Sequence, residues 1–122
     1  MKKFHSLLLV TVTLLISACS PHPVSGVWGT AQDNEYGISK LTMGFDGRAQ
    51  FVTTKLNNAI WHCFWSATGK KQANLDCNPS TDKEQKDIFM LNINDQGDAE
   101  LMHKSKLIST FKLLNENPAI KE

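Results

Sequence analysis

The sequence predicts an all-β domain: a small antiparallel up-and-down barrel, or a barrel-like sandwich, of about eight short strands. Short runs of β-branched and aromatic residues alternate with turn-forming clusters at intervals of roughly 8–12 residues, which is typical of all-β folds. No segment after residue 25 shows a helical period. A closed barrel would also remove the exposed edges that an open sheet of this size would have.

The predicted strands begin at Gly26 and follow one another closely along the chain. In order they are Gly26–Ala31, Ile38–Phe45, Arg48–Thr54, Ala59–Ala67, Gln72–Asn78, Lys86–Asn94, Ala99–His103 and Lys106–Leu114. Clusters rich in Gly, Asn, Asp and Ser separate them. The barrel domain is therefore expected to span residues 26–114, and residues 115–122 are expected to form a flexible tail.

The turn at Asp46-Gly47 decides which side chains of the second and third strands share a face, because a one-residue slip would move a core face to solvent. A two-residue loop would mix polar and apolar side chains on one face. A type I turn with its glycine in the left-handed conformation instead pairs Met43 with Ala49 and Leu41 with Phe51. We prefer this second register.

The first 18 residues have the pattern of a cleaved secretory signal peptide. Lys2 and Lys3 supply a positive start, an apolar run follows from Leu7 to Ile16, and Ser17-Ala18 are small enough for a peptidase cleft. The apolar run is shorter than the ~20 residues that span a bilayer, so a transmembrane helix is the weaker interpretation. The alternative is an ordinary secreted protein with a free thiol at residue 19.

The segment Ile16-Ser17-Ala18-Cys19 resembles the lipobox of bacterial lipoproteins. The resemblance implies cleavage before Cys19, acylation of its sulfur and amino group with chains such as palmitate, and stable anchoring, since two or more acyl chains hold a protein in a membrane. Ser20 stands where an Asp would favour inner-membrane retention, so the resemblance implies the outer membrane. Residues 19–25 are then the acylated Cys and a short tether.

With Cys19 acylated, Cys63 and Cys77 remain as an even pair in an oxidising compartment, and we expect a disulfide between them. If Cys63 faces Cys77, the hairpin around Gly69-Lys70 buries one apolar face: Trp61, Cys63, Trp65, Ala73, Leu75 and Cys77. The opposite face then exposes Ile60 and Phe64, which form a candidate partner patch.

The same alternation continues through the last three strands. It predicts that the following side chains point inward together: Phe89, Leu91, Ile93, Leu101, Leu107, Phe111 and Leu113.

Gly26-Val27-Trp28 resembles the G-x-W motif on the first strand of lipocalin-like barrels. Leu41-x-Met43-x-Phe45-Asp46-Gly47 and Phe111-x-Leu113 also look like small lipocalin-like domains of bacterial lipoproteins. The resemblance covers nearly the whole mature chain and implies that Trp28 plugs one end of the barrel. The mature chain is shorter than a typical lipocalin, so its barrel would be shallow or filled by side chains.

Composition and motifs exclude several classes of function. After cleavage, 11 basic side chains face 12 acidic ones, and Arg48 is the only arginine, so no nucleic-acid surface is expected. No G-x-S-x-G motif ties a nucleophile to a base, so no catalytic residue is predicted. His22, His62 and His103 lack metal-ligand spacing, and Met43, Met90 and Met102 are assigned to packing, so neither a metal nor a cofactor is expected.

The sequence thus favours a non-enzymatic lipoprotein of the cell envelope that binds an apolar small molecule in the barrel mouth or an envelope protein on the Ile60 and Phe64 face. The alternative is a periplasmic inhibitor, of the kind that blocks a lysozyme, or an assembly accessory of an envelope machine. A small-molecule carrier needs an open apolar cavity of about 300 Å³ or more, whereas an inhibitor acting through a loop can be solid inside.

Overall fold

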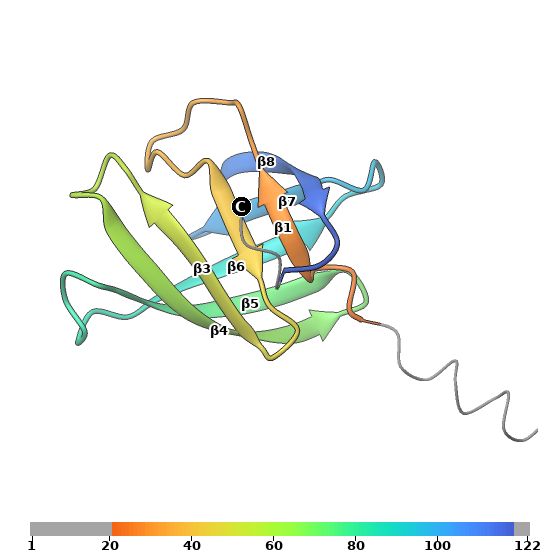
Figure 1. The fold of residues 1–122 in the computed structure, drawn as a ribbon, viewed down its shortest axis with the longest axis horizontal. Helices are drawn as coiled ribbons and strands as arrows, with labels where there is room; N and C mark the ends of the chain where they lie inside the picture. The colour runs from red at the N-terminus through yellow and green to blue at the C-terminus, as the bar shows by residue number, and fades with distance from the viewer. Residues whose placement is uncertain (1–20, 119–122) are drawn as a thin grey trace, which may run out of the picture.

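A computed structural model of the protein describes residues 21–118. Eight antiparallel strands form a closed barrel in which each strand pairs with the next and β8 returns to β1 (Figure 1). The strands are β1 Gly26–Gly29, β2 Lys40–Met43, β3 Arg48–Thr53, β4 Ala59–Gly69, β5 Gln72–Pro79, β6 Asp87–Ile93, β7 Ala99–His103 and β8 Lys106–Asn115. The predicted all-β barrel is confirmed, and the predicted strands match in number and order.

The predicted signal peptide and Cys19 lie outside the described residues. Within residues 21–118, no helix is long and apolar enough to cross a membrane.

Both hairpin registers predicted from side-chain alternation are present. In β2 and β3, Leu41 pairs with Phe51 and Met43 with Ala49, and Gly47 adopts a φ of 82°. In β4 and β5, Cys63 pairs with Cys77, and their sulfurs form a disulfide. Alternation therefore set the register correctly wherever a turn is short and its glycine is well placed.

Side chains fill the interior of the barrel. Phe51 stacks on Trp61 with ring centroids 6.0 Å apart, and Phe89 meets both rings edge-on at 5.1 and 5.7 Å. Trp28 is 2% exposed, and its indole N–H donates to the backbone oxygen of Val24 at 2.9 Å. The buried side chains around these rings are Ile38, Leu41, Met43, Leu75, Leu91, Leu101 and Phe111.

Two of the predicted core positions in β8 are wrong. Leu107 and Leu113 are 47% and 43% exposed. A register shift between Leu101 and Met102 inserts one extra residue into β8, so Ser109 and Phe111 face inward and Leu107 faces solvent. Leu113 pairs with Trp28 beside a second register shift, between β1 and β8, and it is also exposed.

The packed domain also begins earlier than the predicted boundary at Gly26. Val24 is fully buried and Ser25 is 9% exposed. The backbone N–H of Ser25 donates to the oxygen of His22 at 3.0 Å, which closes a turn against the barrel. Residues 22–25 are therefore part of the domain, and the predicted tether is shorter than expected.

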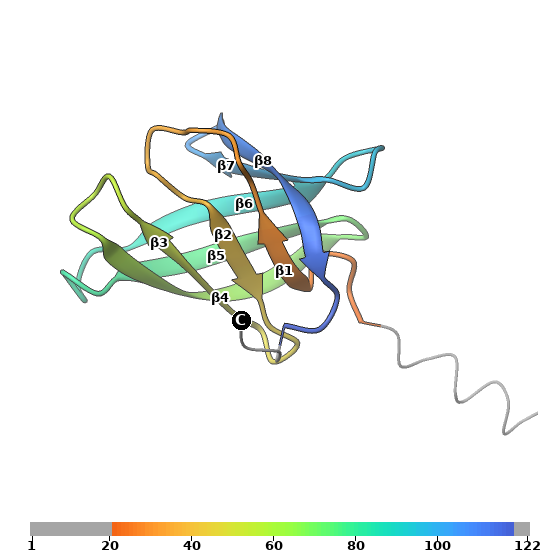
Figure 2. The ribbon, with the colours of Figure 1, turned by 45° about the horizontal axis from the view of Figure 1, so that its top comes forward.

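The two ends of the barrel differ in their connections (Figure 2). The N-terminal end, where β1 begins, has only the short connections that follow β2, β4 and β6. The opposite end, called the capped end below, carries the longer loops 30–39, 54–58 and 80–86, together with the tight turn at Lys104 and Ser105. Figure 1 shows the three longer loops gathered at this end, on the left of the view.

Candidate binding surface on the outer face of the barrel

The two residues of the predicted partner patch lie on the outside of β4. Phe64 is 69% exposed and Ile60 is 37% exposed. They stand four residues apart with His62 between them, which is roughly 13 Å along a strand at about 3.3 Å per residue. Ile60 pairs with Val52 of β3, and Phe64 stands between Arg48 of β3 and Asp76 of β5. The two side chains therefore belong to one strand face without touching.

A second group of apolar side chains faces outward on β6 and β7. Ile88 is 54% exposed, Met90 is 38% exposed, and Met90 pairs with Met102 across the two strands. Met43 is fully buried, as its assignment to packing predicts, and Met102 is partly buried, whereas the assignment of Met90 to packing is wrong. Because side chains alternate along a strand, the burial of Phe89 places its neighbours Ile88 and Met90 on the outer face.

A polar row on β5 separates these two apolar groups. Asp76 pairs with Phe64 on one side and Ile88 on the other, and Asn74 stands in the same way between Ser66 and Met90. The outer face of β3 to β7 thus presents two apolar stripes flanking a line of hydrogen-bonding side chains. This arrangement has the composition of a protein-binding surface, in which apolar anchors are surrounded by polar groups.

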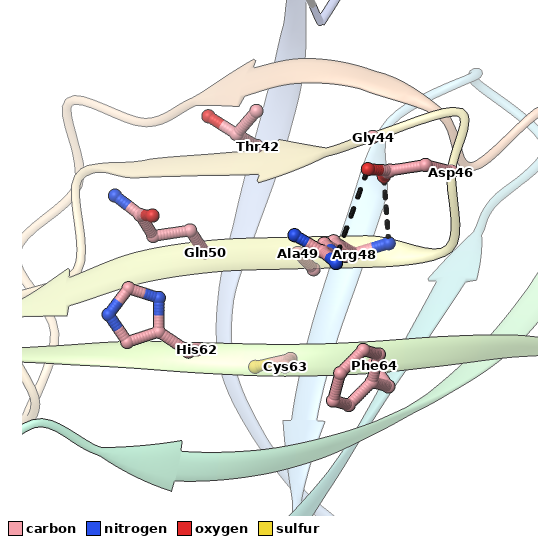
Figure 3. A pocket seen from close by; sticks show the side chains of 9 residues that line it. All are labelled: Thr42, Gly44, Asp46, Arg48, Ala49, Gln50, His62, Cys63 and Phe64. Atoms are coloured by element: carbon pink, nitrogen blue, oxygen red, sulfur yellow. Dashed lines mark hydrogen bonds and ion pairs between the residues drawn. The ribbon is translucent and has the colours of Figure 1, made fainter.

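A groove of about 530 Å³ runs over β2, β3 and β4 (Figure 3). It is lined by Thr42, Gly44, Asp46, Arg48, Ala49, Gln50, His62, Cys63 and Phe64. Figure 3 shows the Arg48 side chain tied to Asp46, with Phe64 on the next strand. Within the described part of the chain, the side chains of Gln50 and His62 have no hydrogen-bond partner, so both can bond to a bound molecule.

A second groove, of about 380 Å³, lies over the other apolar stripe. Ile88, Met90, Met102 and Lys104 line it together with Asn74. The side-chain oxygen of Asn74 is buried and has no hydrogen-bond partner. An acceptor left in this state costs free energy, and a donor from a binding partner would satisfy it.

The capped end contains a chain of polar contacts that the sequence did not predict. The Tyr36 hydroxyl oxygen lies 2.6 Å from His103 Nδ1, and His103 Nε2 lies 3.1 Å from a carboxylate oxygen of Asp87. The His103 ring stacks on Phe89 with centroids 4.4 Å apart. Because an ionised carboxylate only accepts, the Nε2–H group donates to Asp87, and in the tautomer that carries its single proton on Nε2, Nδ1 accepts from the Tyr36 hydroxyl.

This order of side chains resembles a nucleophile, a base and an orienting carboxylate. However, burial, followed by the charges of Glu35 and Asp87, raises the pKa of Tyr36 above its ordinary value. A raised pKa disfavours the tyrosinate, which is the opposite of what an activated nucleophile requires. The contacts instead fasten loop 30–39 to the ends of β6 and β7.

Ion pairs hold the same loop on its outer sides. Lys55 lies 2.6 Å from Asp33 and donates to the backbone oxygen of Asn34 at 3.0 Å, and Lys106 lies 3.4 Å from Glu35. The hydrogen bond and the charge of Lys55 lower the pKa of Asp33. Loop 30–39 is therefore held in one conformation.

The structure does not bring the three described histidines together: His22 is at the N-terminal end, His62 on the outer face and His103 at the capped end. Within residues 21–118, no three His, Cys, Asp or Glu side chains gather into a group that could hold a metal ion.

Aromatic and branched side chains pack together inside the barrel. The grooves over β2 to β4 and over β5 to β7 both lie on the outer face. The chain matches no known family model, no curated protein and no solved structure. Its function therefore has to be inferred from the barrel itself.

Proposed function

We propose that this protein is a non-enzymatic lipoprotein of the bacterial outer membrane that binds another envelope protein through the outer face of β3 to β7. The lipobox resemblance at Ile16-Ser17-Ala18-Cys19 supports the anchor, and the disulfide between Cys63 and Cys77 is consistent with an oxidising compartment. The up-and-down order of the strands is that of lipocalin-like domains.

The observation that carries the proposal is the pair of exposed apolar stripes on a barrel whose interior is full. On the outer face of β3 to β7, Phe64 and Ile88 are the two most exposed apolar side chains, at 69% and 54%, and they flank Asp76. A carrier of apolar small molecules would need a cavity inside the barrel. A protein partner instead needs a broad face with apolar anchors, and burying a side chain such as Phe64 contributes ~1.5–3 kcal/mol.

A cross-linking capture from the protein's own envelope tests this proposal. The acylated chain would be compared with the double variant Phe64→Ser and Ile88→Ser. The matched control is Leu56→Ser, which removes an apolar side chain of 43% exposure from a loop at the capped end. We expect one dominant partner with the original chain and the control, and its loss with the double variant.

Equal capture by all three chains would place the partner elsewhere on the barrel. Recovery of a co-purifying apolar small molecule without a protein would favour a carrier instead. Mass spectrometry of the same material should find Cys19 acylated, and an unmodified Cys19 would overturn the lipoprotein part of the proposal.

Loop 30–39 favours a second candidate, an inhibitor or assembly accessory that works through a loop. Such loops bind tightly when they are already held in one conformation, because little entropy is lost on binding. Lys55, Lys106 and His103 together hold this loop. An inhibitor of this kind would retain its activity in the Phe64→Ser and Ile88→Ser variant and lose it with Ala31→Arg, which places a bulky charge on an exposed position of the loop.

A further inference from the structure

The N-terminal end of the barrel has a small groove between the first described residues and the turn after β2. Its volume is about 340 Å³, and it is lined by Pro21, His22, Ser25, Phe45 and Trp65. Three of these five side chains are aromatic or imidazole rings. The chain thus passes along an aromatic groove immediately after leaving the predicted lipid anchor.

The residues that follow Pro21 are fixed to the barrel. His22 Nε2 lies 2.8 Å from the backbone oxygen of Gly69, and the backbone N–H of Val24 donates to His22 Nδ1 at 3.2 Å. The His22 ring also lies 5.8 Å from the Trp65 ring, centroid to centroid. Only Ser20 and Pro21 therefore separate Cys19 from a residue that is hydrogen-bonded to the barrel.

Phe45 is exposed at the rim of this groove. Its side chain is 57% exposed in the turn between β2 and β3, so the barrel does not use it for packing. The turn itself is held in place, because the indole N–H of Trp65 donates to the backbone oxygen of Gly44 at 2.9 Å. An exposed aromatic ring is thus presented on a fixed turn beside the point where the chain enters the domain.

We propose that this groove and Phe45 lie on the lipid headgroups of the membrane that holds acylated Cys19, an inference that rests on the proposed lipid anchor. From Cys19 to Pro21 the chain spans at most about 7 Å. The headgroup layer is roughly 5–7 Å thick on each side of a bilayer. Pro21, at one edge of the groove, therefore lies within the headgroup layer or at its surface while Cys19 stays in that layer.

The charges around this end indicate which feature of the lipid makes the contact. Lys70 and Lys71 are exposed on the tip of the β4–β5 hairpin, and Asp95 is exposed on the turn after β6. Arg48 lies 3.9 Å from Asp46, and Lys112 lies 3.2 Å from Asp98. The two signs are mixed, so the contact depends on aromatic rings at the interface rather than on anionic lipid.

In this orientation the capped end points away from the bilayer, and the outer face of β3 to β7 forms a side of the barrel that lipid does not cover. This orientation leaves the two apolar stripes accessible to a partner in the same membrane or in the adjoining compartment. It also assigns different contacts to two exposed aromatic residues: Phe45 contacts lipid, and Phe64 contacts the protein partner.

Fluorescence quenching by brominated lipid tests the proposal. The acylated chain that begins at Cys19 would be placed in nanodiscs of phosphatidylcholine whose acyl chains carry bromine close to the headgroup. The probe is Phe45→Trp, and the matched control is Leu56→Trp, at an exposed apolar position of the capped end. We expect the emission added by Phe45→Trp to fall by more than half in brominated discs, and that added by Leu56→Trp to be unchanged.

The original chain supplies a second readout that needs no new tryptophan. Trp28 and Trp61 are 2% and 5% exposed, whereas Trp65 is partly exposed beside the groove. Brominated discs should quench part of the native emission, and Trp65→Phe should remove that quenched part. Replacing some phosphatidylcholine with anionic phosphatidylglycerol should leave the quenching unchanged.

Each outcome bears on a different step. Acylated Cys19 with no quenching at position 45 would overturn this inference and leave the lipoprotein proposal intact. Unmodified Cys19 would overturn both. Equal quenching at positions 45 and 56 would overturn the proposed orientation, because the barrel would then lie on its side. Quenching that appears only with anionic lipid would overturn the proposal that aromatic rings make the contact.

Discussion

The two ends of the barrel are built in opposite ways. At the capped end, polar side chains are turned inward and paired: Tyr36, His103 and Asp87 form a chain of contacts, and Lys55 holds loop 30–39 from outside. At the N-terminal end the connections are short, and Phe45 is 57% exposed. One end uses its polar groups to close the fold, whereas the other leaves an aromatic ring in contact with its surroundings.

The difference separates residues that stabilise the barrel from residues that are available for binding. A partly buried hydrogen-bond chain constrains a loop and costs free energy when it is broken. An exposed apolar ring on a fixed turn contributes little to folding, so it is available for a contact outside the domain. Substitutions at the capped end should therefore change stability, and those at exposed apolar positions should change binding.

Trp28→Ala should have the largest effect, because Trp28 links the core to the N-terminal end. Removing a buried aromatic side chain typically costs ~3–5 kcal/mol. The substitution also removes the donor to the buried backbone oxygen of Val24. Urea denaturation measures the loss, and hydrogen exchange at residues 22–25 measures whether the chain detaches.

Trp28→Phe is the matched control, since it keeps a six-membered aromatic ring in the core and loses the N–H donor with the rest of the indole. It should cost about 1–3 kcal/mol for the acceptor left unpaired. A loss below about 1 kcal/mol in Trp28→Ala would show that Trp28 is not part of the core.

Gly37→Ala should destabilise the capped end, because the added Cβ would clash with residues 54 and 55. Gly37 has a φ of 69°, and a Cβ there would lie 2.9 Å from the backbone nitrogen of Lys55 and closer still to the Thr54 side chain. Left-handed strain and the forced displacement of this backbone together should cost about 3 kcal/mol. Denaturation measures the loss, and faster hydrogen exchange in loop 30–39 should accompany it.

Gly97→Ala supplies the comparison at the N-terminal end. Gly97 has a φ of 82°, but nothing lies within 4 Å of a Cβ placed there. It should show the strain alone, about 1–2 kcal/mol. Equal losses in the two variants would mean that the Gly37 contact with Thr54 and Lys55 relaxes freely.

Tyr36→Phe should reduce stability by a smaller amount at neutral pH, and it should also change how stability depends on pH in alkaline solution. Removing the hydroxyl leaves His103 Nδ1 without its donor and should cost about 1 kcal/mol. Because the pKa of Tyr36 is raised above its ordinary value of 10.0, the unfolded chain ionises first. The stabilisation from Tyr36 is therefore complete below pH 10 and is lost as the pH rises through the raised pKa.

Tyr36 is the only tyrosine in the chain, so an absorbance titration of tyrosinate follows this residue alone. The midpoint should lie above that of the denatured chain. Stability measured against pH should fall less steeply above pH 10 in Tyr36→Phe than in the original protein. Parallel curves would show that Tyr36 does not contribute to the decrease in stability.

The sequence predicted the strands well because side-chain alternation and turn glycines are local signals. The Asp46-Gly47 turn fixed one register, and the cysteine pair fixed another. Alternation also predicted correctly that Phe64 and Ile60 are exposed. The same alternation implies that Ile88 and Met90 face outward, but Met90 was assigned to packing because methionine often fills gaps in a core.

The errors came from features that no local pattern carries. A single extra residue in β8 reversed the direction of Leu107. The burial of Val24 depends on Trp28 and on Gly69, which is 47 residues from its partner His22. Tyr36 and His103 are 67 residues apart, and only the closed barrel brings them together. Alternation along one strand gives the direction of a side chain but not its distant partners.

Phe64→Ser should have the smallest effect on stability and the sharpest effect on binding. Phe64 is 69% exposed and has no ring contact with the aromatic core, so unfolding should change by less than about 0.5 kcal/mol. Thermal denaturation checks this value, and capture of the envelope partner checks the second part. A loss above ~2 kcal/mol would mean that Phe64 is a packing residue. Unchanged stability with lost capture would show that Phe64 serves binding and not folding. This is the result expected if paired side chains stabilise the barrel and exposed apolar side chains bind partners.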